Sequence, residues 1–176
     1  DAIIENSYAT GNVTGSNTVG GGFIGGFAGS NAAVIRNSYA QGDVSGADSE
    51  VGGFVGQNFG LIENSYSTGN FKKTSPSIST YNYGGFAGVN SGTITGSYST
   101  GNANGTMEGI DINTIISLGS SSVGGFAGIN RGNITKSYST GKASGRYYIG
   151  GLVGSNSEEG VILDSHSTGD VIGYTR

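Results

Sequence analysis

The stretch VGGFAGINRGNITKSYSTGKASG, residues 123 to 145, decides the fold, because variants of it recur along the whole chain. Its first half carries the phrase GGF, a small residue, Gly, any residue and Asn. The apolar residue of this phrase stands at Phe27, Phe54, Phe86, Phe126 and Leu152. Its second half carries Ser and an aromatic residue, usually followed by a small residue, Thr and Gly, with the aromatic residue at Tyr8, Tyr39, Tyr66, Tyr98, Tyr138 and His166. The chain is therefore a tandem repeat, and its fold must repeat with it.

The spacing is constant in one half of the repeat and variable in the other. Each Phe precedes the next Tyr by 12 residues, whereas Leu152 precedes His166 by 14. The return to the next Phe or Leu varies from 14 to 28 residues, so we expect loop insertions there, at 71–82 and 104–122. We interpret residues 1–176 as one repeat domain cut from a longer protein.

The composition of the repeat selects strands. The period, measured between successive aromatic residues of the second phrase, runs from 27 to 40 residues, and each repeat holds many glycines and β-branched or hydroxyl residues, which make poor helices. A unit of this length supplies three strands of about five residues with turns between them. We therefore predict an all-β fold, a three-sided parallel β-solenoid of about five coils. The crossover rule favours a right-handed coil.

Stacked coils place equivalent residues in columns. We expect apolar columns to fill the interior: the GGF column (Phe27, Phe54, Phe86, Phe126, Leu152), an Ile column (Ile35, Ile62, Ile94, Ile134, Ile162) and a column that starts the third strand (Val13, Val44, Phe71, Ala103, Ala143, Val171). An asparagine follows each GGF phrase, at Asn31, Asn58, Asn90, Asn130 and Asn156. We predict a ladder in which each amide bonds the next, because such a ladder satisfies polar groups at a buried corner.

The tyrosine column is the candidate interaction surface. The position two residues before it reads Asn, Asn, Asn, Gly, Lys and Asp, which favours a solvent-facing side, and strand alternation then turns the aromatic residues outward and the serine between them inward. The interaction surface would consist of Tyr39, Tyr66, Tyr98, Tyr138 and His166. A buried tyrosine stack preceded by a bulge fits the pattern nearly as well.

Charge and composition exclude several classes of partner. Only 11% of the residues are charged and the net charge is −4, so nothing indicates binding to nucleic acid or to anionic lipid. No apolar run is long enough to insert into a membrane. The chain has no cysteine and one histidine, and lacks metal-binding motifs, so we expect no cofactor and no metal site. Asp43, Asp48 and Glu50 could bind Ca²⁺ weakly from one return loop, although solvated loop charges are the simpler interpretation.

The motifs that resemble catalytic sequences fail on physical grounds. The segment KSYSTGKAS lacks the first glycine of a phosphate-binding loop and has Ala143 where that loop requires Ser or Thr. Asp164, Ser165 and His166 are consecutive, and neighbours on a strand point to opposite faces, so they cannot form a local catalytic chain. We predict that the chain is not an enzyme.

The repeated phrases GFAG, GFVG and GLVG, each followed by Asn and then by the Ser-aromatic phrase, resemble the GLUG motif repeats of bacterial surface and secreted proteins. The resemblance covers nearly the whole chain. It implies a β-helical segment of a secreted or cell-surface bacterial adhesin of the filamentous-haemagglutinin type. Such repeats also occur beside the catalytic region of immunoglobulin A peptidases.

The resemblance implies a non-catalytic stalk or binding surface that acts in adhesion, with a host or cell-surface protein or glycan as partner. A carbohydrate-binding or polysaccharide-processing β-helix is the alternative, and the non-catalytic region of a surface peptidase is a further one. A solenoid end also exposes unpaired strands, which template association, so we expect self-association through the ends.

Overall fold

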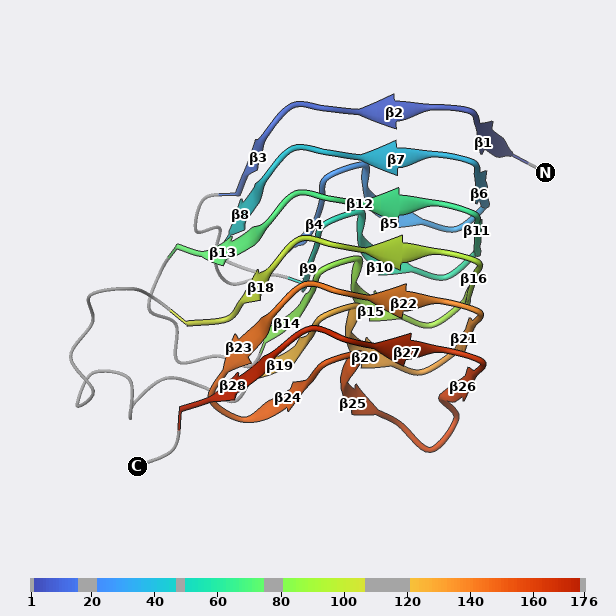
Figure 1. Cartoon of the computed structure of the whole chain (residues 1–176). Coiled ribbons are helices and arrows are strands. Elements are labelled where there is room, and N and C mark those ends of the chain that lie inside the picture. Colours follow the sequence, from blue (N-terminus) through green and yellow to red (C-terminus); the bar gives the residue numbers. More distant parts are fainter. Residues whose placement is uncertain (1, 16–21, 47–49, 75–80, 107–120, 175–176) are drawn as a thin grey trace.

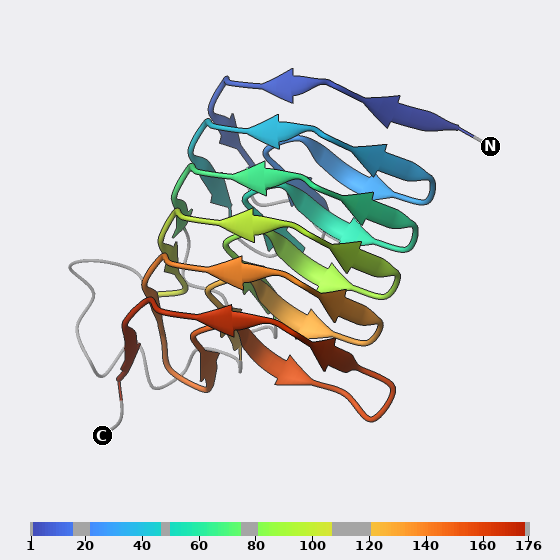
Figure 2. The ribbon, with the colours of Figure 1, turned by 45° about the vertical axis from the view of Figure 1, so that its right-hand side comes forward.

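The chain folds as a parallel β-solenoid. A computed structural model describes residues 2–15, 22–46, 50–74, 81–106 and 121–174. These residues form 28 short strands and no helix. Each strand pairs in parallel with the equivalent strand of the neighbouring repeat, so the repeats stack as coils from the N-terminal end (blue) to the C-terminal end (red) in Figures 1 and 2. The fold class expected from the sequence is confirmed.

Five sheets run along the stack, named A to E here. Sheet A holds β1 (Ile3–Glu5), β6 (Val34–Arg36), β11 (Leu61–Glu63), β16 (Thr93–Thr95), β21 (Asn133–Thr135) and β26 (Val161–Leu163). Sheet B holds β2 (Tyr8–Ala9), β7 (Tyr39–Ala40), β12 (Tyr66–Ser67), β17 (Tyr98–Ser99), β22 (Tyr138–Ser139) and β27 (His166–Ser167). Sheet C holds β3 (Val13–Thr14), β8 (Val44–Gly46), β13 (Phe71–Lys73), β18 (Ala103–Asn104), β23 (Ala143–Gly145) and β28 (Val171–Gly173).

The GGF phrase forms the remaining two sheets. Sheet D holds β4 (Phe23–Gly25), β9 (Glu50–Gly52), β14 (Tyr81–Gly84), β19 (Ser121–Gly124) and β24 (Tyr148–Gly150). Sheet E holds β5 (Ala28–Asn31), β10 (Val55–Asn58), β15 (Ala87–Asn90), β20 (Ala127–Asn130) and β25 (Val153–Asn156). A coil therefore passes through sheets D, E, A, B and C in that order.

The coil is divided more finely than the three strands that the sequence suggested. The segment VGGFVG, residues 51–56, is divided between two strands, because the chain bends at Gly53 and Phe54 between β9 and β10. The phrase LIENSYS is also split, because Asn64 adopts a left-handed conformation with φ of 47° between β11 and β12. Five short strands thus replace three longer ones, and each bend gives the coil an extra corner.

The interior is divided into two apolar clusters. The larger contains the GGF column and the Ile column, whose middle members Phe54, Phe86, Phe126, Ile62, Ile94 and Ile134 are fully buried. The smaller lies between sheets C and D and contains Val44, Val51, Phe71, Tyr83, Ala103 and Val123. Sheet B bonds across the interior to the bend between sheets D and E, since the Ser67 and Ser99 hydroxyls donate to the carbonyls of Gly85 and Gly125 at 2.7 Å. The expected interior columns are confirmed, but they do not form one core.

The two predicted insertions begin and end in strands. Phe71–Lys73 is β13 and Tyr81 opens β14, so the ends of the range 71–82 belong to the solenoid frame. The range 104–122 likewise starts at the last residue of β18 and finishes inside β19. Residues 75–80 and 107–120 lie outside the described residues. Within the described residues, the chain contains no helix of the length and hydropathy needed to cross a membrane.

Candidate interaction surface

A left-handed bend orients the tyrosine column. The residue two positions before each aromatic residue has a φ between 47° and 59°, at Asn6, Asn37, Asn64, Gly96, Lys136 and Asp164. Asn, Asp and Gly adopt this conformation more readily than other residues, which explains why they dominate the column. From the sequence, these residues indicated only solvent exposure. Their backbone role was missed, although the run of Asn, Gly and Asp was a signal for it.

The serine between this bend and the tyrosine points inward and forms a ladder of its own. Ser38, Ser65, Ser97 and Ser137 are buried. Each backbone N–H of this column donates to the hydroxyl of the next coil, for example Ser65 to Ser97 at 3.2 Å. The same hydroxyls donate to the carbonyl two residues earlier, as in Ser97 to Thr95 at 3.0 Å. This ladder fixes the direction in which the next residue points.

The aromatic rings then project from sheet B to the outside. They form one continuous stack from Tyr8 to His166, with centroid spacings of 5.3, 5.0, 4.9, 5.0 and 5.3 Å. The middle rings are half-buried, whereas the serines on both sides of them in sequence are buried. The outward orientation is therefore confirmed, and the alternative of a buried stack is wrong.

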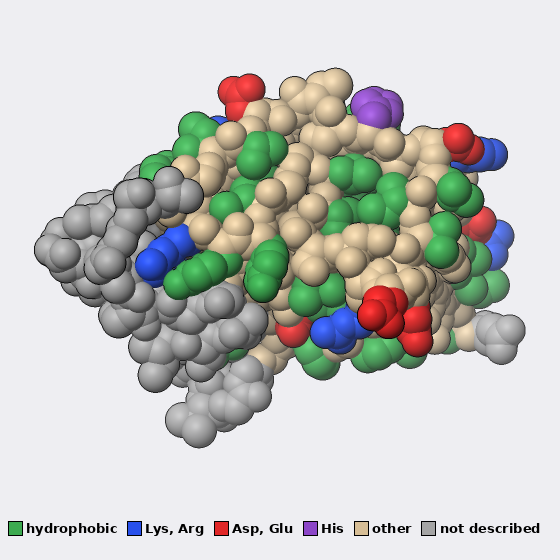
Figure 3. All heavy atoms as spheres, turned by 90° about the horizontal axis from the view of Figure 1, so that it is seen from below, with side chains coloured by type: hydrophobic (Ala, Val, Ile, Leu, Met, Phe, Trp, Pro, Cys, Tyr) green, Lys and Arg blue, Asp and Glu red, His purple; other side chains and the backbone are tan. Residues whose placement is uncertain are grey.

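The stacking limits what the column can offer to a partner. Each inner ring covers the faces of its two neighbours, so the column presents ring edges and phenolic hydroxyls rather than open ring faces. Burial is the main cause that raises the pKa of Tyr98 above its usual 10.0, and the adjacent Tyr138 and Tyr66 add to it. The surface is thus a row of phenolic hydroxyls, one per coil, that ends at the exposed imidazole of His166 (purple in Figure 3).

The predicted asparagine ladder is present at the corner between sheets E and A. Each side-chain amide donates to the side-chain carbonyl of the next coil, at 2.8, 2.9, 2.9 and 2.8 Å from Asn31 to Asn156. The amides also donate to the carbonyl two residues on, as in Asn90 to Gly92 at 3.2 Å. Asn58, Asn90 and Asn130 are fully buried. This column holds coils together and is closed to a partner.

A second polar ladder, which the sequence analysis missed, lies at the corner between sheets B and C. The backbone N–H of Asn70 donates to the Asp43 carboxylate at 2.8 Å, and that of Asn102 donates to the Asn70 side chain at 3.0 Å. The TGN and TGD phrases were the signal for it, since Asn or Asp stands at this position in most coils.

The loop carboxylates are placed in structural roles. Asp43 belongs to the ladder just described, and Glu50 accepts two bonds from the Asn82 amide at 3.0 and 3.1 Å. Burial raises the pKa of Glu50, and the bond from Asn82 and the charge of Arg131 oppose this only in part. Asp48 lies outside the described residues. Across the ranges that the structure describes, no three His, Cys, Asp or Glu residues are grouped as metal ligands would be.

The three consecutive residues that resemble a catalytic triad do not act together. Asp164 occupies the left-handed bend with φ of 49°, and the Ser165 hydroxyl donates to the carbonyl of Leu163 at 2.7 Å. His166 stacks on Tyr138 as a member of the aromatic column. Each residue thus has the structural role of its column.

The two ends of the stack carry exposed apolar side chains. Ile3, Ile4, Tyr8 and Phe23 are exposed at the N-terminal end of the stack. Figure 3 looks onto the last coil, where Val161, Leu163, Val171 and Tyr174 are exposed. Of these side chains, Ile4 and Val171 belong to columns that are buried in the middle coils, where the neighbouring coil packs on them.

The geometry defines the class of protein: a repeat protein of the parallel β-solenoid class, held by polar ladders at its corners and carrying an aromatic column outside. The chain belongs to the family of the GLUG motif, whose family model matches residues 15–45, 47–72, 119–144 and 145–172, more than half of the chain. No curated protein matches it. The coil between these matches keeps the same columns, since Phe86, Asn90 and Tyr98 occupy their places in it.

Proposed function

We propose that this GLUG repeat module is a non-catalytic structural and interaction element of a secreted or cell-surface bacterial protein, acting in adhesion as a stiff stalk or binding surface. One observation carries the proposal: columns of identical contacts run unbroken from coil to coil. The aromatic stack, the buried asparagine ladder and the serine ladder all connect the same coils. A rod built in this way resists bending, because a bend would break several ladders at once.

The placement of reactive side chains supports a non-enzymatic role. The single histidine is stacked in the aromatic column, and Glu50 and Asp43 are bonded within the frame. Catalysis needs a nucleophile, a base or a pair of carboxylates converging on one cavity. The described residues place such groups in separate columns along different sheets.

The partner is a host or cell-surface protein or glycan, and the surface that supports this is the outer face of sheet B. Its ring edges and hydroxyls are repeated every coil, which suits a partner that is itself extended. A carbohydrate-binding role is the second candidate, favoured by this hydroxyl row. A solenoid region beside the catalytic domain of a surface peptidase would use the same features.

The test compares binding of the purified chain to a glycan array and to immobilised host-cell proteins. The informative variants are Tyr66→Phe with Tyr98→Phe, which keep the stack and remove two hydroxyls, and Tyr66→Ala with Tyr98→Ala, which also interrupt the stack. Thr95→Ala with Thr135→Ala is the matched control, since these residues point outward from sheet A in the coils of Tyr98 and Tyr138. We expect both tyrosine pairs to reduce binding about tenfold and the control to leave it unchanged. Equal binding by all variants would contradict the proposal that the outer face of sheet B binds the partner.

A further inference from the structure

On the outer face of sheet A, the first three coils carry apolar side chains in one column and charged side chains in the next column but one along the strand. The outward residues of β1, β6 and β11 are Ile3 and Glu5, Val34 and Arg36, and Leu61 and Glu63. In the next two coils the same positions are polar, with Thr93 and Thr95 in β16 and Asn133 and Thr135 in β21. The corresponding positions of sheet C are largely polar, for example Ser45 and Lys72.

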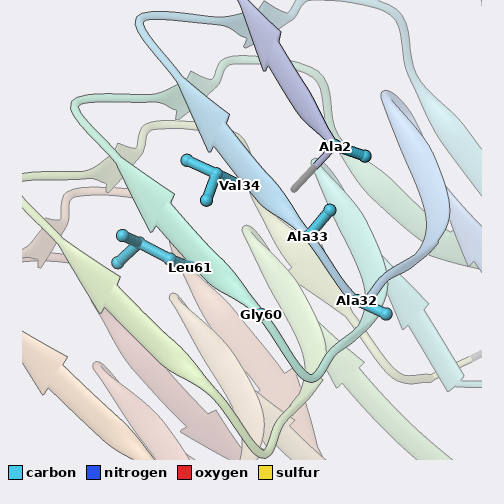
Figure 4. Close-up of a pocket in the computed structure, with 6 residues that line it drawn as sticks. All are labelled: Ala2, Ala32, Ala33, Val34, Gly60 and Leu61. Carbon is cyan, nitrogen blue, oxygen red and sulfur yellow. The ribbon is translucent and has the colours of Figure 1, made fainter.

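A shallow hollow of about 390 Å³ lies at the edge of this face. Ala2, Ala32, Ala33, Val34, Gly60 and Leu61 line it. Figure 4 shows Val34 and Leu61 side by side on neighbouring strands, with Ala32 and Ala33 on the turn that leads into β6. Phe59 takes the place of Ala32 in the next coil and is 53% exposed, a large apolar side chain with no cover.

Consecutive coils of this face are complementary to each other. The register aligns Leu61 with Val34 and Glu63 with Arg36, and the equal turns before the two strands align Phe59 with Ala32. The large side chain of Phe59 thus stands at the same position in its coil as the small side chain of Ala32 in the coil before. Glu63, which is negative, stands at the same position as Arg36, which is positive.

We infer that this face binds a second copy of the chain, across a two-fold axis that runs along the strands between β6 and β11. Such an axis sets β6 of one copy against β11 of the other. Phe59 of the second copy then enters the hollow at Ala32, Val34 meets Leu61 of the second copy, and Arg36 meets Glu63 of the second copy. The same three contacts recur on the other side of the axis, as an isologous interface requires.

Within a single chain, Arg36 has only a weak ionic partner and can accept another from a second copy. Arg36 approaches Glu5 at 3.9 Å from Nε, a long ion pair, and the Arg36 side chain is 39% exposed. A carboxylate supplied across the interface would give the guanidinium the bidentate partner it suits. The face is only a few strands high at about 4.8 Å per strand, so the buried area is small and the dimer should be weak.

The test is sedimentation equilibrium of the purified chain over a wide concentration range. Phe59→Ser with Leu61→Thr installs the residues that stand at these two columns in the fourth coil, Ser91 and Thr93, so the solenoid should tolerate them. We expect a monomer–dimer equilibrium in the wild type and a dissociation constant about tenfold higher in this variant. A monomeric wild type, or a variant that dimerises as well as the wild type, would overturn the proposal.

Charge reversal tests the orientation independently. Arg36→Glu alone and Glu63→Arg alone place like charges across the axis and should weaken the dimer, whereas the two together restore opposite charges and should restore it. Lys72→Glu on sheet C makes the same change of charge on another face and should leave dimerisation as it was. Thermal unfolding of each variant shows whether it is folded. Failure of the combined reversal to recover dimerisation in a folded chain would contradict this geometry.

Discussion

At the scale of single residues, the left-handed bend before the tyrosine is occupied in one coil by a residue that does not favour this conformation. Asn, Asp or Gly occupies it in five coils, but Lys136 occupies it in one, with φ of 48°. Unlike Asn or Asp, lysine has no short polar side chain that can bond to the nearby backbone. Nothing of this kind therefore offsets the steric cost of the conformation, which is about 1–2 kcal/mol for an L-residue. Lys136 is exposed, so its side chain adds little packing in return.

We therefore predict that Lys136→Asn stabilises the chain by about 0.5–1 kcal/mol, because Asn tolerates this conformation better. Asn64→Lys, at the same position of another coil, should destabilise it by a similar amount. Urea unfolding of both variants measures the effect. A lower midpoint for Lys136→Asn would show that the backbone conformation does not govern this site.

At the same scale, a glycine in the TG phrase tests how closely the coils approach. A Cβ on Gly69 would overlap the carbonyl oxygen of Gly42 in the coil before it, whereas a Cβ on Gly11 meets nothing within 4 Å. We predict that Gly69→Ala costs about 2 kcal/mol or more, while Gly11→Ala stays within about 0.5 kcal/mol. Thermal unfolding of the two variants gives the comparison. Equal effects would mean that the coils are not stacked as described.

At the scale of elements, the ladders determine the stability of the corners. Asn90 donates to Asn130 and to Gly92, and accepts from Asn58, all away from water. Asn90→Ala removes one bond from each neighbouring amide, and also the bonds that its own amide donates to Gly92 and Asn133, so it should cost about 2–4 kcal/mol. Asn156→Ala, at the exposed last rung, should cost about 1 kcal/mol or less. A denaturant titration that ranks these two variants in the opposite order would refute a cooperative ladder.

Sheet D contributes a dependence on pH through Glu50. Its pKa in the folded chain is raised above 4.5 by burial, so the folded state favours the protonated form. A raised carboxyl pKa means that stability is lost as the pH rises from the unfolded pKa to the folded one. Glu50→Gln removes this loss, so the free energy of unfolding of this variant should rise relative to that of the wild type across the pH range that begins at the usual carboxyl pKa of 4.5. A constant difference over this range would argue against a buried carboxylate.

The sequence was sufficient to predict elements that depend on periodicity. The Phe, Ile and Asn columns follow from spacing alone, because a parallel stack brings equivalent residues together whatever the path between them. The bends at Gly53 and Asn64 could not be predicted in the same way. One straight strand and two short strands joined by a bend show the same alternation of inward and outward residues. The Ser67 bond to Gly85 lies between the two cores, and it joins sheet B of one coil to the bend between sheets D and E of the next, a contact that the spacing of the repeat does not reveal.

At the scale of the whole molecule, the in-register stack defines the surface available to partners. The outer columns of sheets A and B lie on neighbouring faces, one with an apolar and charged pattern and the other with a row of phenols. Self-association through the ends stays a prediction. It would produce open-ended growth, which distinguishes it from a dimer formed through sheet A.

The most direct test of the stack is a disulfide between two coils. Thr95 and Thr135 are register partners in sheet A, and their hydroxyls lie 2.9 Å apart although 40 residues separate them in sequence. Their Cα atoms should be about 4.8 Å apart, within the range that a disulfide spans. The chain has no cysteine, so the variant Thr95→Cys with Thr135→Cys forms no competing bond. Its control, Thr95→Cys with Asn133→Cys, shifts the second thiol by two residues along β21.

Mass spectrometry after mild oxidation measures the yield of intramolecular disulfide in the monomer fraction. Register stacking predicts nearly complete bond formation for the first pair, a small yield for the control, and a higher unfolding temperature for the bridged chain. The absence of a bridge in the first pair, or an equal yield in the control, would contradict the stack of coils from which the proposed function is drawn.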